Sequence, residues 1–324
     1  MNELVSIIIP VFNRSQMVVE AIESALSQTY RPIEIIVVDD GSTDGTAATL
    51  EELRVHHPDC LKVLRQVNAG PGPARNLGLS ESKGDFIQYL DSDDLLKPSK
   101  LERQVAVMRE HSEAGVSYCV THRRNTVTGL IIPWAQTEES IENLFPSFLP
   151  KRGWATLTPL WRRSVCEQIG PWADFRVMED WEHDLRAGML GIMPVHVPEV
   201  LCEVRDHEQN RASGMNTGFT RDLTRDFFRA HESVWLHMKS HGLTDWSYTE
   251  RFSRTMFWVA RMCGSFGLAT EAELALDYTD EMTEMNGRRG STTAFRLVKR
   301  AVGWKFAVAA SERTRGVARI VKGV

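Results

Sequence analysis

Five aspartates follow two apolar segments of the chain, and their spacing suits the binding of a cation. Two of them end the segment at 33–38 and three follow the segment at 86–90: Asp39, Asp40, Asp91, Asp93 and Asp94. In open α/β sheets, ligands collect beyond the carboxyl ends of the strands. Two acidic clusters that share such an edge would repel each other unless a cation lay between them. The pattern therefore predicts a divalent metal ion and a phosphorylated ligand at one edge of a sheet.

The elements around these aspartates alternate between strand and helix patterns. Continuous apolar runs indicate strands at residues 4–11, 33–39, 61–66, 86–90 and 115–121. Helices are expected at residues 15–27, 73–79 and 99–111, with one more after the turn at 41–45. Thr43 or Asp44 can cap that helix, and Pro73 suits the first position of the next. This order predicts an α/β fold with a mostly parallel, doubly wound sheet.

The remainder of the chain is less regular. A helix is expected at 180–190, and Pro194 and Pro198 make 193–204 an edge or irregular strand. From about Phe219 the pattern is helical, with breaks at four glycines: Gly242, Gly264, Gly267 and Gly287.

These patterns suggest two domains. We expect a catalytic domain over 1–215, with a nucleotide and metal half at 1–122 and an acceptor half at 123–215. A helical region follows over 216–324 and ends in a basic tail at 288–324.

Composition bounds the class of protein. The chain has 324 residues, a net charge of -5 and 42% hydrophobic residues, enough to bury a core. Its five cysteines are scattered without a CxxC pair, which favours free thiols in a reducing cytoplasm. The first residues lack the pattern of a signal peptide, and no apolar stretch approaches the ~20 residues of a membrane span. A cytoplasmic protein is therefore expected.

Charge is concentrated in the last residues. Residues 288–324 hold ten Lys and Arg against Glu312 alone, which leaves a net charge of about -14 on the rest of the chain. An acidic body with a basic tail argues against nucleic-acid binding. Four apolar residues recur in the tail at helical spacing among basic ones: Phe295, Val298, Val302 and Phe306. The segment is expected either to lie on an anionic membrane, at the inner face of the plasma membrane, or to pack on the acidic body.

Several ordered blocks carry a resemblance to a known family. They read SIIIPVFNR at 6–14, VDDGSTDGT at 38–46, NAGPGPARNLG at 68–78, DSDD at 91–94, and shorter blocks at 161–163, 169–172 and 179–182. Over about residues 4–215 the chain resembles the family 2 glycosyltransferases of GT-A fold. The resemblance implies an inverting, metal-dependent enzyme that moves a sugar from a nucleotide-sugar, with UDP as the expected nucleotide. The acceptor implied is a hydroxyl of a glycan or glycolipid.

The resemblance also implies roles for residues of the first half. Asp93 would ligate Mn²⁺ or Mg²⁺, which prefer hard oxygen ligands, and Asp91 would reach the ribose or a metal-bound water. Asp94 would cap the segment that follows. The remaining donor contacts implied are Asp40 to the uracil ring, Pro10 and Phe12 along its slot, and Arg75 near the nucleotide or its phosphates. On generic ion-pair reasoning, Arg75 is equally a structural partner of the acids at 39–44.

The acceptor half supplies the expected base. Asp180 would take the proton of the acceptor hydroxyl, with Glu179 as the second choice. A helix cap without a catalytic role is the alternative for Asp180. Trp181 is the best-placed tryptophan to stack on a sugar. Downstream, the resemblance implies a metal or phosphate contact by His207, helped by two residues of the same loop: Arg211 and Ser213.

Three other classes of protein fit the sequence less well. A nucleotidyltransferase would carry a glycine-rich loop after the first strand, and residues 10–14 contain no glycine. A dinucleotide-dependent dehydrogenase is disfavoured for the same reason. A non-catalytic sugar-nucleotide-binding scaffold stays open, although every expected acid is present.

Overall fold

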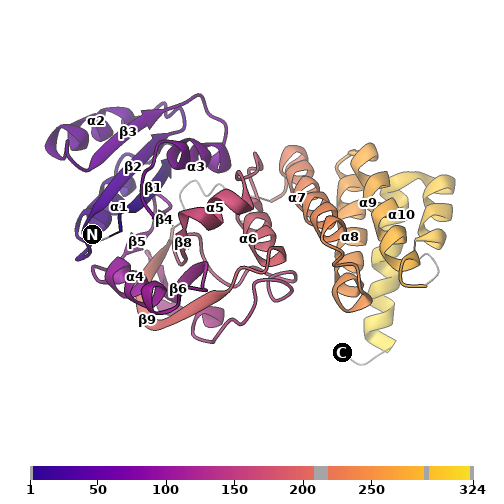
Figure 1. Cartoon of the computed structure of the whole chain (residues 1–324). Helices are drawn as coiled ribbons and strands as arrows, with labels where there is room; N and C mark the ends of the chain where they lie inside the picture. Colours follow the sequence, from indigo (N-terminus) through magenta and orange to yellow (C-terminus); the bar gives the residue numbers. More distant parts are fainter. Residues whose placement is uncertain (1–2, 208–217, 288–291, 322–324) are drawn as a thin grey trace. The chain divides into compact units, whose positions relative to one another are not determined.

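Strands and helices alternate along the first half of the chain, as the sequence predicts. The computed structural model describes residues 3–207, 218–287 and 292–321 (Figure 1). Contacts divide the chain into two compact units, Met1–Arg211 and Ala212–Val324. The first unit holds the sheet, and the second holds helices α7 to α10.

One mixed sheet organises the first unit. Its strands are β1 Val5–Val11, β2 Ile33–Asp39, β3 Leu61–Arg65, β4 Phe86–Tyr89, β5 Leu95–Leu96, β6 Val116–Asn125, β7 Ile131–Pro133, β8 Leu160–Arg162 and β9 Pro194–Asp206. The order is β3-β2-β1-β4-β8-β6-β9-β5, with β7 paired to β6. Strands β1 to β4 are parallel, as are β6 and β9, whereas β5, β7 and β8 run antiparallel to their partners. This sheet confirms the predicted α/β class and GT-A arrangement.

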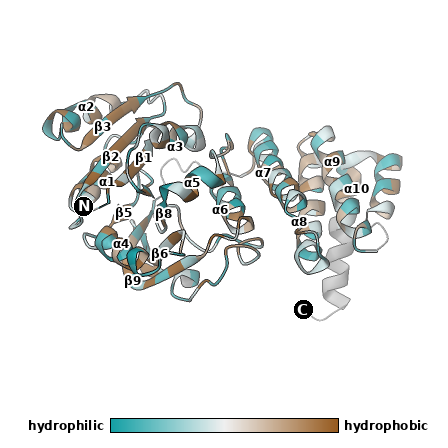
Figure 2. Ribbon diagram, in the orientation of Figure 1, coloured by the Kyte–Doolittle hydropathy of each residue, from teal (hydrophilic) through white to brown (hydrophobic). Residues whose placement is uncertain are grey.

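Helices cover the sheet because its strands are apolar on both faces (Figure 2). In chain order the helices of this unit are α1 Met17–Leu26, α2 Thr46–His56, α3 Pro71–Ser80, α4 Lys100–Glu110, the 3₁₀ turn Ala135–Thr137, α5 Arg163–Ile169 and α6 Glu179–Met189. Pro71, rather than the expected Pro73, begins α3. Asp44 accepts a 2.9 Å hydrogen bond from the Thr46 N–H at the start of α2.

Strand β9 carries the chain back to the carboxyl ends of the parallel strands. Its pairing with β6 shifts register on either side of Val120, which confirms the irregular strand expected from Pro194 and Pro198. The strand is longer than predicted, because its pairing with β6 continues to Asp206 opposite Asn125. Its last residues therefore reach the edge where the acidic loops lie.

Four long helices make up the described part of the second unit. They are α7 Arg221–Ser240, α8 Trp246–Ser265, α9 Ala269–Glu284 and α10 Thr293–Val321. Glycines with positive φ follow three of their ends, at Gly242, Gly267 and Gly287. Gly264 is not a break, because it lies inside α8 and meets the Trp304 ring. In the part of the chain that the structure describes, no helix is long and apolar enough to cross a membrane.

Candidate active site

The loops after β1 and β2 are joined at the carboxyl edge of the sheet. The Asn13 N–H donates to Ser42 Oγ at 2.9 Å, and the Thr43 N–H donates to Asn13 Oδ1 at 2.8 Å. Asn13 adopts a left-handed φ of 52°, a conformation that Asn tolerates better than most residues. Residues 29 and 30 positions apart in the chain thus form one loop cluster beside the first acidic pair.

Asp39 and Asp40, the first acidic pair, differ in their hydrogen-bond partners. Asp40 accepts hydrogen bonds from Gln66 Nε2, the Ala69 N–H and the Gly70 N–H, at 2.7, 2.8 and 2.9 Å. The expected contact between Asp40 and a nucleobase stays a prediction, since this carboxylate already organises the loop before α3. Asp39 is 1% exposed, and its Oδ2 has no hydrogen-bond partner within the described residues. Its nearest cation, Arg65, lies 3.4 Å away.

Asp39 Oδ2 forms an ion pair with Arg65 but accepts no hydrogen bond among the described residues, so Asp39 is a candidate acceptor for the base, a role that the family resemblance implied for Asp40. A buried acceptor without a hydrogen bond is unfavourable unless a ligand completes it. Phe12 follows Val11, which pairs with Asp39 across β1 and β2, and it is 43% exposed, so its ring is available to a flat ligand. Pro10 is buried in β1 opposite Val38, where it can only form the floor of such a slot. Both roles stay predictions.

Asp93 and His207 lie side by side. His207 Nε2 is 3.0 Å from Asp93 Oδ2, and Arg14 forms an ion pair with the same oxygen. Burial would raise the pKa of Asp93, but the hydrogen bond to His207 and the charge of Arg14 hold it well below its usual range. Asp93 is therefore ionised at neutral pH. The structure brings together a pair that is 114 residues apart in the chain.

This pair fits a divalent metal ion. Mn²⁺ and Mg²⁺ commonly take one or two protein ligands and complete their shell with phosphate oxygens and water. Within residues 3–207, 218–287 and 292–321, no group of three or more His, Cys, Asp or Glu side chains is arranged to hold a metal. Asp93 and His207 would thus hold the ion only together with a ligand. His207 Nδ1 is buried and without a hydrogen-bond partner among the described residues.

Asp94 has a different role from the expected one. Its Oδ1 accepts a 3.0 Å hydrogen bond from the Arg205 N–H, so it ties the acidic loop to β9 instead of capping the segment after it. Arg205 also donates through Nε to the Asp93 carbonyl. Both contacts fix the loop that carries Asp93. The remaining loop residues predicted to contact phosphate, Arg211 and Ser213, lie outside the described residues.

Arg75 links the two halves of the site. Its guanidinium donates to Asp91 Oδ1 at 2.8 Å and to Glu179 Oε1 at 3.0 Å, and it lies 4.5 Å from the centroid of the Trp172 ring. The side chain is 3% exposed. Arg75 is therefore a partner of acids, but of Asp91 and Glu179 rather than of the acids at 39–44. It holds the loop after β4 against the first turn of α6.

Glu179 is buried beside Arg75. Burial and the charge of Asp180 raise the pKa of Glu179 to about 7, although the nearby Arg75 opposes the shift. A carboxyl group that titrates near neutrality is a common property of active sites. Glu179 therefore stays in consideration as a proton acceptor.

The raised pKa of Glu179 predicts a pH-dependent stability. In the unfolded chain a Glu titrates near pH ~4.3, so between about pH 4.5 and 7 the folded state binds more protons than the unfolded state. Its free energy of unfolding should fall as pH rises through this window. Between pH 5 and pH 8, the free energy of unfolding measured in urea should fall further for the wild type than for Glu179→Gln. The difference should be about 2 kcal/mol, because a shift of one pKa unit corresponds to about 1.4 kcal/mol. Equal losses would contradict the buried, protonated Glu179.

Asp180 lies in the first turn of α6 but does not cap it. The N-cap residue is Met178, with a left-handed φ of 66°, and no side chain caps the helix. Asp180 Oδ2 accepts a 2.6 Å hydrogen bond from Arg152 Nη1, and Oδ1 accepts one from the Trp181 N–H at 2.7 Å. Its side chain is 33% exposed. The helix-cap alternative is thus wrong, and the carboxylate remains within reach of an acceptor.

Arg152 is another residue whose role sequence reasoning missed. Besides Asp180, it contacts Asp184 Oδ2 through Nε at 2.6 Å and Thr156 Oγ1 at 3.1 Å. Asp184 is 1% exposed and also accepts from Trp154 Nε1 at 2.7 Å. Arg152 lies in the aperiodic segment before β8, where no local pattern marks it. It anchors Asp180 to the core of the acceptor half.

Trp181 cannot stack on a sugar. It is 3% exposed, and its indole N–H donates to the Phe148 carbonyl at 2.8 Å. The prediction of an acceptor contact is wrong because this side chain belongs to the core. Three other tryptophans of the acceptor half are also buried: Trp154, Trp161 and Trp172. Trp172 stacks on His183 at a centroid distance of 3.9 Å, and its ring also packs against the Arg75 guanidinium.

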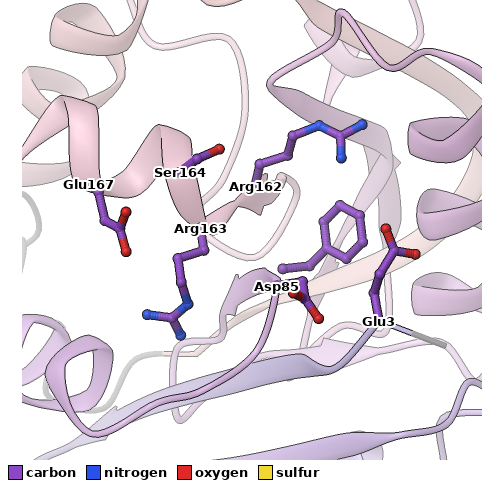
Figure 3. A pocket seen from close by; sticks show the side chains of 7 residues that line it. Glu3, Asp85, Arg162, Arg163, Ser164 and Glu167 are labelled. Atoms are coloured by element: carbon purple, nitrogen blue, oxygen red, sulfur yellow. The ribbon is translucent and has the colours of Figure 1, made fainter. Parts of the chain in front are cut away.

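A separate pocket of about 360 Å³ lies at the opposite ends of the strands (Figure 3). Glu3 and Asp85, which line it, precede β1 and β4. Its two arginines donate hydrogen bonds to backbone carbonyls: Arg162 to Ala114 at 2.9 Å, and Arg163 to Gly84 at 2.5 Å. The pocket is remote from the carboxyl edge and lies beside the pairing of β4 with β8.

Comparison with known proteins relates part of the chain to a known family. Residues 6–159 match the family model described as Glycosyl transferase family 2. An uncharacterised glycosyltransferase of Nostoc sp. is 40% identical over 114 residues, which is 35% of this chain and 35% of that protein. The chain matches about a third of the length of the first such relatives.

Solved structures share the fold. S. aureus TarS 1–349, in complex with UDP-GlcNAc, superposes with a TM-score of 0.68 at 19% identity and covers 96% of this chain and 91% of that one. The mannosyltransferase PcManGT from Pyrobaculum calidifontis, in complex with GDP-Man and Mn²⁺, has a TM-score of 0.53 at 17% identity over 98% of this chain and 80% of that one. Residues 6–159 of this chain thus match the glycosyltransferase family 2 model, and the chain shares the GT-A fold of the solved structures.

Proposed function

We propose that the protein is an inverting, metal-dependent glycosyltransferase that moves a sugar from a nucleotide-sugar to a hydroxyl group. The observation that carries this is the bridge of Arg75 between Asp91 and Glu179. Asp91 lies on the loop predicted to bind the donor, and Glu179 adjoins Asp180, the predicted base. One buried side chain therefore joins the leaving-group side of the site to the acceptor side, as a single displacement requires.

The donor is a nucleotide-sugar, with UDP as the proposed nucleotide. Two neighbours in fold are described in complex with UDP-GlcNAc and with GDP-Man. In this chain the buried Asp39 Oδ2, which accepts no hydrogen bond among the described residues, and the exposed ring of Phe12 suit a flat base that offers an N–H. We propose Asp39 for that contact, since Asp40 is occupied by the loop at 66–70.

Asp93 and His207 would hold Mn²⁺ or Mg²⁺ together with the donor's diphosphate. When bound, such an ion supplies positive charge that stabilises the leaving diphosphate. Arg14 already contacts Asp93 and brings a fixed positive charge to the same corner. A second support for the metal is the Mn²⁺ described with the mannosyltransferase PcManGT.

Asp180 would accept the proton of the acceptor hydroxyl. Arg152 orients its carboxylate, while a third of the side chain stays exposed to an incoming ligand. Attack from the side opposite the leaving group inverts the sugar configuration. The acceptor in this proposal is a glycan or a glycolipid of the cell envelope.

The test is a thermal-shift screen of nucleotide-sugars with Mn²⁺, followed by a turnover assay. A bound donor should raise the melting temperature by mass action. With acceptor extracts, the enzyme should release nucleotide diphosphate and leave the sugar on the acceptor. A nucleotidyltransferase would instead exchange pyrophosphate or a sugar phosphate, and a non-catalytic scaffold would show the shift without turnover. Either of those outcomes would replace the proposed reaction.

A further inference from the structure

One side of α10 is fixed on its neighbours in the second unit. Phe295 is 8% exposed, and its ring meets that of Phe257 in α8 at a centroid distance of 5.3 Å. Trp304 lies against Gly264 of α8, where any side chain would collide with the indole. The membrane-facing position expected for Phe295 is therefore wrong. Because these contacts hold the helix, its other side is presented on a rigid support.

The other side of α10 is apolar and exposed. Leu297, Val298 and Val302 are 61%, 42% and 48% exposed, and Phe306, beyond the kink at Gly303, is 72% exposed. Positions four apart share a face of a helix, so Val298 and Val302 lie one above the other, and Leu297 borders Val298 on the exposed side. We call Leu297, Val298, Val302 and Phe306 the outer face. Single exposed apolar residues are ordinary, but a contiguous set on one element marks an interaction surface.

The charges on α10 are divided between its two sides. Arg296 and Lys299 form ion pairs with acids of α9, namely Glu273, Asp277 and Asp280. Arg300 and Lys305, in contrast, are exposed and have no ion pair within the residues that the structure describes. Two cations of α10 therefore pair with acids of α9, and the two exposed ones are accessible to a binding partner. The partner must match cations interleaved with apolar side chains.

We propose that the outer face docks on an anionic phospholipid surface. Apolar side chains would enter the headgroup region while Arg300 and Lys305 meet lipid phosphates. Residues 288–324 hold ten basic residues against one acid, whereas the rest of the chain is strongly acidic. An anionic surface would thus attract this segment and repel the remainder, which selects one orientation of docking. The transfer chemistry does not require this contact, so the inference goes beyond the proposed reaction.

Flotation of the full chain with vesicles tests the proposal. One vesicle preparation is phosphatidylcholine alone, and the other also contains phosphatidylglycerol. The protein should float with the anionic vesicles about tenfold or more better than with the neutral ones, since each cation near the surface contributes about fivefold. Added salt should weaken the binding. Equal flotation with both preparations, or none with the anionic one, would overturn the proposal.

Two variants test whether binding depends on the outer face or on exposed apolar side chains in general. Leu297→Ser with Val302→Ser and Phe306→Ser should lower binding to anionic vesicles at least about tenfold, without a change in melting temperature. Val127→Ser with Leu130→Ser, which changes side chains of the first unit that are 74% and 62% exposed, should bind like the wild type. Equal losses in both variants would refute the assignment.

A second copy of the chain is the competing occupant. Light scattering after gel filtration should give the same mass for the wild type and the outer-face variant. A wild-type dimer that the variant converts to a monomer would overturn the membrane docking in favour of self-association.

Discussion

Asp180→Asn should bind nucleotide-sugar normally and transfer almost no sugar. Asn is nearly isosteric with Asp and can still meet Arg152, but it cannot accept the proton of an attacking hydroxyl. General base catalysis contributes about 10² to 10⁴ in rate, and kcat should fall by that factor. The donor should bind unchanged, because Asp180 lies on α6 and its hydrogen-bond partners, Arg152 and the Trp181 N–H, belong to the acceptor half. Transfer rate and calorimetric donor affinity are the two measurements.

Two further variants sharpen the result. Asp59→Asn, the same change at an exposed turn before β3, should transfer at the wild-type rate. Glu179→Gln should retain more activity than Asp180→Asn if Asp180 is the base. Near-normal transfer by Asp180→Asn together with loss in Glu179→Gln would exchange their roles.

The sequence predicted the parts of the site that local patterns encode. The acids follow apolar runs, and parallel strands bring their carboxyl ends to one edge. The role of His207 beside the metal was implied by the family resemblance, and the structure places this side chain 3.0 Å from Asp93. The fold class followed from the same alternation of strands and helices.

Partners chosen by the tertiary fold could not be predicted. Arg152 reaches Asp180 across 28 residues of aperiodic chain, and Arg14 reaches Asp93 from the loop after β1. Each arginine has many acids within a plausible sequence distance, so only the assembled fold selects the pair. The same holds for Arg75, whose two acid partners are 16 and 104 residues away.

Which face of a helix is buried could not be predicted from the sequence either. Trp181 follows Asp180 directly, yet adjacent residues on a helix point about 100° apart, so one faces the site and the other the core. In α10 the apolar period shows that one face is buried without showing which. There the kink at Gly303 and the contact with α8 decide that Phe295 is inside and Leu297 is outside.

Asp93→Asn should abolish the effect of Mn²⁺ on nucleotide binding. The change removes the one carboxylate placed beside His207, and an amide is a poor ligand for a hard cation. In calorimetry, UDP should bind the wild type more tightly with Mn²⁺ than with a chelator, and the variant should give the weaker value in both. Loss of a metal's charge stabilisation is worth several kcal/mol, so turnover should fall at least about a hundredfold.

The control for Asp93→Asn is Asp206→Asn, one residue from His207 and paired with Arg123 at 2.5 Å. This variant should keep the response to Mn²⁺, because its carboxylate is engaged by that arginine on β6. Because Asp93→Asn also removes an ion-pair partner of Arg14, the melting temperature without ligand must be compared first. A folded Asp93→Asn protein that still binds UDP more tightly with Mn²⁺ would show that the ion is held elsewhere. The proposed pairing of Asp93 with the metal would then be wrong, while the assignment of Asp180 would be unaffected.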